Sequence, residues 1–141
     1  MIQLTRNDIN QLYEVRIAIE SRAIVALCKA QNADHLQQLE IQIAKMRQAS
    51  QSGDAKTLVE NELEFHTMLC RFSGNAYLLR ISESLQDQVR LALTLDNANY
   101  SEMKNVAEEH IPLVQAIRSG DIDTAVQELE VHILASLDAM G

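Results

Sequence analysis

The sequence predicts an all-α protein, folded as an antiparallel bundle of six helices. Its 141 residues include only 4 glycines and 1 proline, the two residues that most often interrupt helices. Apolar residues make up 47% of the chain, and they recur at the three- and four-residue spacing of a helix face. A chain of this length suits one domain with its own core, so residues 1–141 are treated as a single unit.

Capping and turn residues bound each expected helix. Thr5 or Asn7 can cap the first helix, which should run to about Gln31. Turns containing Gly, Asn or Asp separate the other helices. The second helix should end at about residue 50, the third should cover about 54–72, and the fourth should run from 75 to about 95–97. After a loop over 97–101, the fifth should end near 118, and the sixth should follow 121. Because the turns are short, consecutive helices should run antiparallel.

The first helix is apolar on two sides. One stripe consists of Leu12, Ile19, Ala23 and Ala26, and the other of Ile9, Tyr13, Ile17, Ile24 and Leu27. A helix of this kind usually packs against two neighbours. We therefore expect the second stripe to meet a partner chain, which predicts a homodimer.

Four residues that can bind metals lie on apolar stripes. Glu62 and His66 are one turn apart on the third helix, His110 lies on the fifth, and His132 on the sixth. A helix rises about 1.5 Å per residue, and this count places all four within about one turn of one level of the bundle. Burying three imidazoles and a carboxylate without a cation would be costly. The four therefore predict a site for zinc, nickel or manganese. The alternative is that each is a hydrogen-bonded core residue in a helical dimer that has no site.

Arg16 lies within the inward stripe of the first helix, one to two turns from the level of the histidines. A guanidinium that faces a core needs an anion, and the carboxylate of a small acid would suit its fork of donors. We predict that Arg16 binds such an effector. Two alternatives stay open: Glu20, one turn further along the helix, could satisfy it internally, or the side chain could extend to the rim.

Charge and composition exclude several functions. The formal net charge is −8, which argues against nucleic-acid binding by this chain itself. No run approaches 18 uninterrupted apolar residues and the start does not resemble a signal peptide, so we expect no membrane segment. Cys28 and Cys70 have no metal or redox spacing and should be buried thiols of a cytoplasmic protein.

Several segments together resemble the FCD domain, the C-terminal effector-binding domain of FadR-subfamily GntR-type bacterial transcription regulators. They are 12–20 (LYEVRIAIE), 62–66 (ELEFH) followed by 73–75 (SGN), 109–110 (EH), 116–121 (AIRSGD), and His132. The resemblance covers nearly the whole chain. It implies that the winged helix-turn-helix domain of such regulators is absent from this chain, so that DNA is bound only through that missing domain.

The resemblance also implies a site. By motif position, Glu62, His66, His110 and His132 would bind a divalent metal, with zinc as the first expectation, and a small organic or sugar acid would bind beside it. Glu62 departs from the family, which commonly has Asp there. The inward arginine of the family falls on Arg16, and the dimer would use the first and fourth helices.

We expect a metal-dependent sensing and dimerisation domain rather than an enzyme. The alternative is a helical-bundle metalloenzyme, because three histidines and a carboxylate can leave open positions on a metal that activates water. Against it, the sequence contains no HExxH, no repeated Glu-x-x-His pair and no spare general base in a distinctive context.

Overall fold

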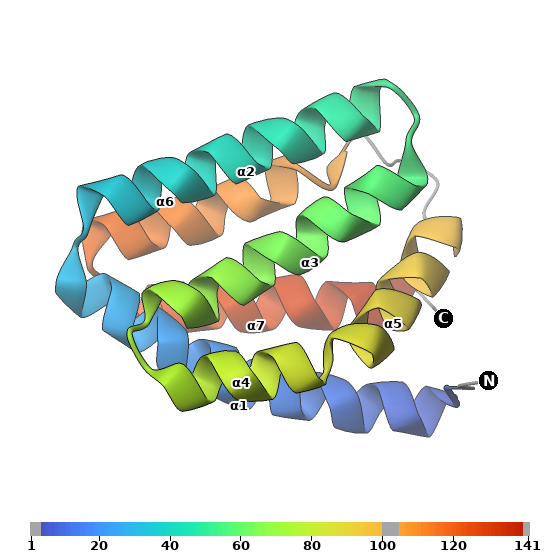
Figure 1. Ribbon diagram of the computed structural model, residues 1–141, viewed down its shortest axis with the longest axis horizontal. Helices are drawn as coiled ribbons and strands as arrows, with labels where there is room; N and C mark the ends of the chain where they lie inside the picture. The colour runs from blue at the N-terminus through green and yellow to red at the C-terminus, as the bar shows by residue number, and fades with distance from the viewer. Residues whose placement is uncertain (1–3, 100–104, 140–141) are drawn as a thin grey trace.

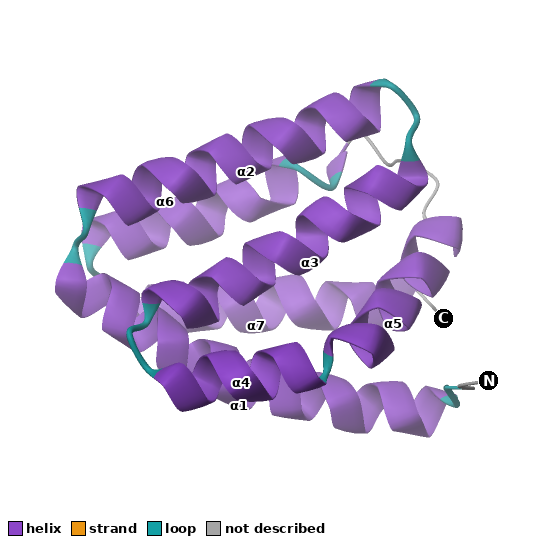
Figure 2. Cartoon of the chain, viewed as in Figure 1, coloured by secondary structure: helices purple, strands orange, loops and turns teal. Residues whose placement is uncertain are grey.

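All regular secondary structure is helical in a computed structural model that describes residues 4–99 and 105–139 (Figure 2). The helices are α1 (Arg6–Ala30), α2 (Ala33–Gln51), α3 (Ala55–Phe72), α4 (Ala76–Ser84), α5 (Gln86–Asn99), α6 (Ile111–Ser119) and α7 (Ile122–Ala139), with a 3₁₀ turn, η2 (Glu108–His110), before α6. The predicted all-α class is confirmed. The described residues form seven α-helices, however, and not six.

The extra helix arises because the predicted fourth helix is broken at Leu85. This residue has φ −100° and ψ 0°, outside the helical region, and separates α4 from α5. Its N–H donates to the carbonyls of Ser82 and Glu83, and the Ser84 hydroxyl donates to the carbonyl of Ile81 at 2.7 Å. Serine hydroxyls that bond to nearby carbonyls weaken a helix without any proline or glycine. Leu85 itself packs against a small apolar cluster of α3 and α5.

The region before α6 also differs from the prediction. The expected fifth helix begins only at Ile111, and His110 lies in the preceding 3₁₀ turn. The exposed Pro112 lies in the first turn of α6, where its missing N–H costs nothing. Helix α5 extends to Asn99, into the predicted loop over 97–101, and the rest of that loop lies outside the described residues.

Helices α3 and α7 lie in the middle of the bundle, between two pairs of helices (Figure 1). In Figure 1, α2 and α6 lie along one side of the bundle, α1 and α4 along the other, and α3 and α7 between them. Helix α1 packs on α7, α3 and α4. Thr5 caps α1 through a reciprocal pair of bonds with Asp8, as one of the two predicted caps. At the other end of α1, Gln31 donates to the carbonyl of Ile117 at 2.7 Å and ties this end to α6.

The prediction that the second stripe of α1 meets a partner chain is wrong. Ile9, Tyr13 and Ile24 are at most 3% exposed within this one chain. The reason is that α1 lies between α7 on one side and α3 and α4 on another, so its own bundle covers most of both stripes. A homodimer would need a different surface.

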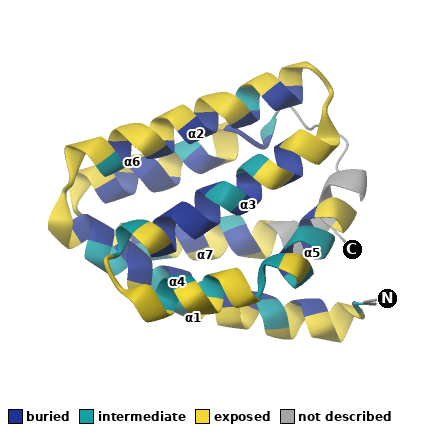
Figure 3. Ribbon diagram, in the orientation of Figure 1, coloured by how far each residue is buried: buried dark blue, intermediate teal, exposed yellow. Residues whose placement is uncertain are grey.

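Burial is uneven among the helices (Figure 3). Helix α3 is the most deeply buried, and ten of its residues face the core. By contrast, none of the nine described residues of α4 is buried, and its Tyr77 and Ile81 are 70% and 44% exposed. Cys28 and Cys70 are buried free thiols, as predicted, and burial raises the pKa of Cys70 to about 12. Within the described residues, every helix is too short or too polar to cross a bilayer.

Candidate metal centre

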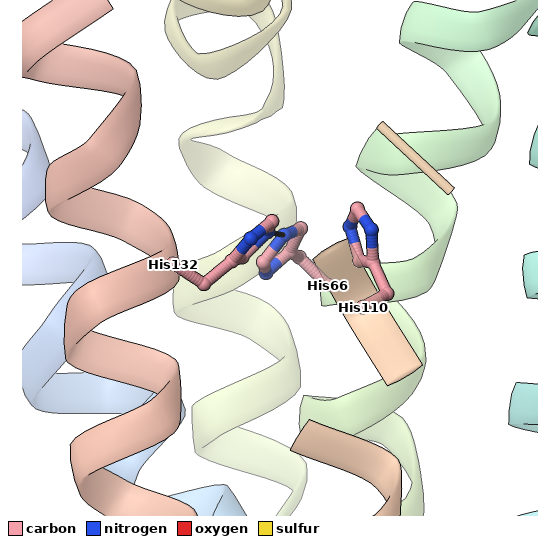
Figure 4. Close-up of side chains that lie close together, drawn as sticks. All are labelled: His66, His110 and His132. Atoms are coloured by element: carbon pink, nitrogen blue, oxygen red, sulfur yellow. Dashed lines mark hydrogen bonds between the residues drawn. The ribbon is translucent and has the colours of Figure 1, made fainter. Parts of the chain in front are cut away.

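Three histidines from three separate segments converge inside the bundle (Figure 4). His66 comes from α3, His110 from the turn before α6, and His132 from α7. One ring nitrogen of each lies within 4.8 Å of the others. His66 and His110 are at most 4% exposed, and His132 is partly buried. The structure therefore brings together three of the four residues that the sequence predicted as metal ligands.

The ring of His66 is held from both sides. Its Nδ1–H donates to Oε1 of Glu20 at 2.5 Å, because a carboxylate oxygen can only accept. In the neutral ring this leaves Nε2 with the lone pair, and Nε2 lies 3.2 Å from Nε2 of His132. The rings of His66 and His132 are nearly parallel, with an interplanar angle of 9°.

His110 is held in the same tautomer by the backbone. Its Nδ1–H donates to the carbonyl of Val106 at 2.7 Å, so that Nε2 carries the lone pair. This Nε2 is buried and has no hydrogen-bond partner among the described residues. A buried polar atom without a partner is rare in a folded protein and needs an explanation. Phe65 packs edge-on against the ring, with centroids 4.8 Å apart, and keeps it from turning away.

The environment keeps two of these rings neutral. Burial, assisted by the nearby His66, lowers the pKa of His110 to about 3. Burial also lowers the pKa of His132 well below its usual value, assisted by the other two histidines. Neutral imidazole is the form that binds a metal, so both rings are available as ligands at neutral pH.

Glu62 is not part of this group in the structure. It is 4% exposed and lies one turn before His66 on the same helix, as predicted. Its carboxylate is not among the atoms that lie within 4.8 Å of one another in the described part of the chain. Its charge acts instead on Arg16, where it contributes to raising the pKa of the guanidinium.

Arg16 faces the core, as predicted, with 3% exposure. Its Nε donates to Oε2 of Glu20 at 3.2 Å, so the internal partner considered from the sequence is present. Burial alone would lower the pKa of Arg16, but Glu20, Tyr13 and Glu62 together outweigh it and the net shift is upward. In the same way, burial would raise the pKa of Glu20, but His66 and Arg16 outweigh it and the net shift is downward. The pair is therefore ionised in the fold.

A small cavity adjoins these groups. Arg16, Glu20 and His66 line it together with Ser82 of α4 and residues of α3 and α5. Its volume is about 10 Å³, which is room for about one water. The closed bundle therefore has no space here for an organic acid.

The three rings fit a metal ion. Two nitrogens at about 2.05 Å from a tetrahedral zinc lie about 3.3 Å apart, and the Nε2 atoms of His66 and His132 are 3.2 Å apart. The unpartnered Nε2 of His110 supplies a third donor. In two of the rings, Nδ1 donates to a carboxylate or a carbonyl, as is usual for histidines that bind metals. The remaining histidine, His35, lies apart and stacks on Phe72.

Sequence reasoning did not assign Glu20 to the metal site. It was noted only as a partner for Arg16, although the same helix-rise count places it about 6 Å closer than Arg16 to the level of the histidines. Its second bond, to His66, depends on how α1 packs against α3.

Comparisons with known proteins agree with the fold. The family model described as the FCD domain matches residues 11–135. A relative from Paenarthrobacter nicotinovorans named "Probable D-xylose utilization operon transcriptional repressor" is 28% identical over 138 residues, which cover 97% of this chain and 60% of the relative.

Two solved structures have the same fold. GntR from Streptococcus agalactiae has a TM-score of 0.80 at 24% identity, over 98% of this chain and 62% of its own. The metal-free FCD domain of TM0439 also has a TM-score of 0.80, at 20% identity, over 99% of this chain and 95% of its own. At these identities the likeness shows the fold alone. The chain spans about three fifths of the lengths of the repressor and of GntR.

Proposed function

Because this chain belongs to the FCD domain family, we propose that it is the metal-dependent acid-sensing and dimerisation domain of a bacterial GntR-type transcription regulator. The family match supports an effector-binding domain of a regulator, and the relatives carry regulator names. The bound metal, the acid effector and the homodimer are our proposals beyond the family match.

One observation supports the proposed metal site. The buried Nε2 of His110 has no partner among the described residues and faces two further imidazoles. His66, His110 and His132 would hold a divalent ion, with zinc as the first expectation and nickel or manganese as alternatives. Glu62, one turn from His66, would complete the set after a change of rotamer. The bound metal would supply a Lewis-acidic centre that attracts oxygen ligands.

The effector would be a small carboxylic or sugar acid. One of its oxygens would approach the metal and its carboxylate would approach Arg16, whose guanidinium lines the adjoining cavity. Because Arg16 is already paired with Glu20, the acid must share it or displace the glutamate. Because the cavity is about 10 Å³, α4 must also move to admit the acid. Helix α4 has the fewest core contacts to break, since none of its described residues is buried.

The homodimer would use the exposed apolar residues of α1 and α4. Val15 is 44% exposed on α1, and Tyr77 and Ile81 are 70% and 44% exposed on the adjacent α4. A dimer through α4 would connect the helix that must move with the partner chain. DNA would be bound by a part of the longer regulator outside this chain, which implies a cytoplasmic location.

A thermal-shift screen of organic and sugar acids, with and without EDTA, tests this function. A ligand at about 100 times its Kd stabilises the folded state by about 2.7 kcal/mol. We expect one class of acid to raise Tm only in the metal-loaded protein. If no metal co-purifies and added zinc leaves Tm unchanged, the metal-dependent proposal is wrong.

Two further measurements separate the alternatives. The loss of a contact between Arg16 and the acid should cost on the order of 1.5–3 kcal/mol of affinity in Arg16→Gln, with metal content retained. Unchanged affinity would remove Arg16 from the effector site. Turnover of the bound acid, followed by NMR, would favour the metalloenzyme instead.

A further inference from the structure

Both oxygens of the Glu20 carboxylate are engaged in the core. Oε1 accepts from Nδ1–H of His66 at 2.5 Å, and Oε2 accepts from Nε of Arg16 at 3.2 Å. The residue is 3% exposed, so water competes little for either bond. Glu20 thus connects α1 to the histidine of α3 whose other nitrogen faces His132.

The bond to Glu20 decides which nitrogen of His66 can act as a donor to a metal. Neutral imidazole carries one hydrogen, and its position is set by the partner of the other nitrogen. With the hydrogen held on Nδ1, the lone pair is on Nε2, the atom nearest His132. The opposite tautomer would direct a hydrogen at His132 and leave Oε1 of Glu20 facing a lone pair.

His110 offers a comparison within the same site. Its Nδ1 donates to the neutral carbonyl of Val106, whereas Nδ1 of His66 donates to a full negative charge. A carboxylate partner increases the electron density on the ring and makes the other nitrogen a stronger ligand.

We propose that Glu20 is the positioning residue of the metal centre, fixing His66 in the tautomer that presents Nε2 and strengthening it as a ligand. This rests on the metal binding proposed above. Glu20 itself would not touch the metal, because both of its oxygens are engaged. Arg16 takes Oε2 and leaves Oε1 for His66, so the bond to His66 does not depend on Arg16.

A purely structural role is the alternative. In that case Glu20 serves only to neutralise buried Arg16, and the loss of either member of the pair would disturb the site equally. The two roles differ in one outcome: Arg16→Gln leaves the charge of Glu20 on His66, whereas Glu20→Gln removes it. Only the positioning role predicts that the two variants bind metal differently.

Zinc titrations against a competing chelator test this difference. Loss of such a partner typically weakens metal binding 10- to 100-fold. We expect about that loss in Glu20→Gln, a smaller loss in Glu20→Asp, which keeps the carboxylate, and little change in Arg16→Gln. Glu60→Gln is the matched control, because Glu60 pairs with Arg90 on the exposed surface. Equal affinities for Glu20→Gln and wild type would overturn the proposal, as would equal losses in Glu20→Gln and Arg16→Gln.

The tautomer provides a second test that needs neither a variant nor a metal. Long-range ¹H–¹⁵N correlation spectra of the metal-free wild type should show His66 protonated at Nδ1. A dominant Nε2–H form would contradict the proposal even if all variants fail to fold. Failure of wild type to bind zinc would instead refute the metal site, and the spectra would still report whether Glu20 holds His66.

Discussion

His110 combines a firmly held ring with a buried nitrogen that has no partner among the described residues. Its Nδ1 bond to Val106 and its contact with Phe65 hold the ring rigidly, while Nε2 is left buried without a partner in the described chain. Most buried polar atoms in folded proteins have a partner, so this nitrogen needs an explanation. Its exposure of 0% means that the unpartnered nitrogen is not satisfied by bulk water.

Removal of either of two histidines should abolish stable metal binding. His110→Ala and His132→Ala each delete one of three converging donors, and we expect metal content after purification without chelator to fall from about one ion per chain to a small fraction of it. Elemental analysis measures this. His35→Ala is the control, because His35 stacks on Phe72 away from the group. Unchanged content in both site variants would refute the assignment.

The metal-free protein should lose stability as pH falls from about 6.5 toward 5. His110 has a pKa of about 3 in the fold, against about 6.5 in an unfolded chain. Between these values the unfolded state binds a proton that the folded state does not. The free energy of unfolding then decreases with falling pH, by up to about 1.4 kcal/mol per pH unit. The lowered pKa of His132 acts in the same direction.

Urea unfolding in EDTA at pH 7.5, 6.5, 5.5 and 5.0 would measure this dependence. The range lies above the usual pKa of carboxyl groups, so histidines dominate it. In His110→Gln, the free energy of unfolding should depend less steeply on pH, by about the contribution of one proton. A constant free energy of unfolding between pH 7.5 and 5.0 would show that the buried histidines are not kept neutral.

At the residue scale, periodicity predicted the inward positions of His66 and His132 because helix phase and rise determine where a side chain points. His110 meets them although it lies in a 3₁₀ turn and not on the predicted helix. The same reasoning could not say where the carboxylate of Glu62 lies, which is outside the group of three in the structure, and it did not connect Glu20 with His66. A glutamate has three side-chain torsions, so its helix position does not specify where its carboxylate lies. In the structure the carboxylate that reaches His66 comes from α1, and the contact joins residues 46 positions apart.

Helices α4 and α6 show how far an element's sequence predicts its packing. Both have nine residues and strong amphipathic patterns, yet α6 buries four residues while none of the described residues of α4 is buried. The break at Leu85 was not predictable from proline or glycine, because the segment contains neither. It depends on local serine bonds and on the packing of Leu85 against α3 and α5.

Amide exchange should therefore be much faster in α4 than in α6. Few buried contacts imply a low free energy of local opening. Hydrogen–deuterium exchange by mass spectrometry can compare these two helices of equal length. We expect an acid found by the thermal screen to slow exchange in α4 selectively, because Ser82 of α4 lines the cavity that the acid would enter. Equal protection of α4 and α6 in the metal-loaded, acid-free protein would contradict the proposed movement.

For the whole molecule, the apolar surface that one chain leaves exposed indicates where a proposed dimer could form. The stripe on α1 that was expected to meet a partner is buried inside the bundle, whereas Tyr77 and Ile81 of α4 are exposed. Sequence periodicity could identify apolar faces but could not tell which neighbour covers each one. That depends on the path of all seven described helices.

A charged residue on α4 should separate the dimer. We expect wild type to be a dimer at tens of micromolar, an ordinary range for a standard interface, and Ile81→Glu to be a monomer, because the substitution buries an unpaired charge. Light scattering measures both. Ile41→Glu is the matched control, since Ile41 is 50% exposed on α2, on the other side of the bundle. A dimeric Ile81→Glu would place the interface elsewhere.

The adjacency of α1 and α7 has a consequence for how the protein is made. His66 and His132 are separated by 66 positions, which a ribosome covers in roughly 3–13 s. During that time α1 has been synthesised but lacks α7, one of the helices on which it packs, and only two of the three histidines are present. A nascent chain of this protein therefore leaves the face of α1 that α7 covers unprotected until α7 emerges, and a metal ion that needs all three histidines could bind only afterwards.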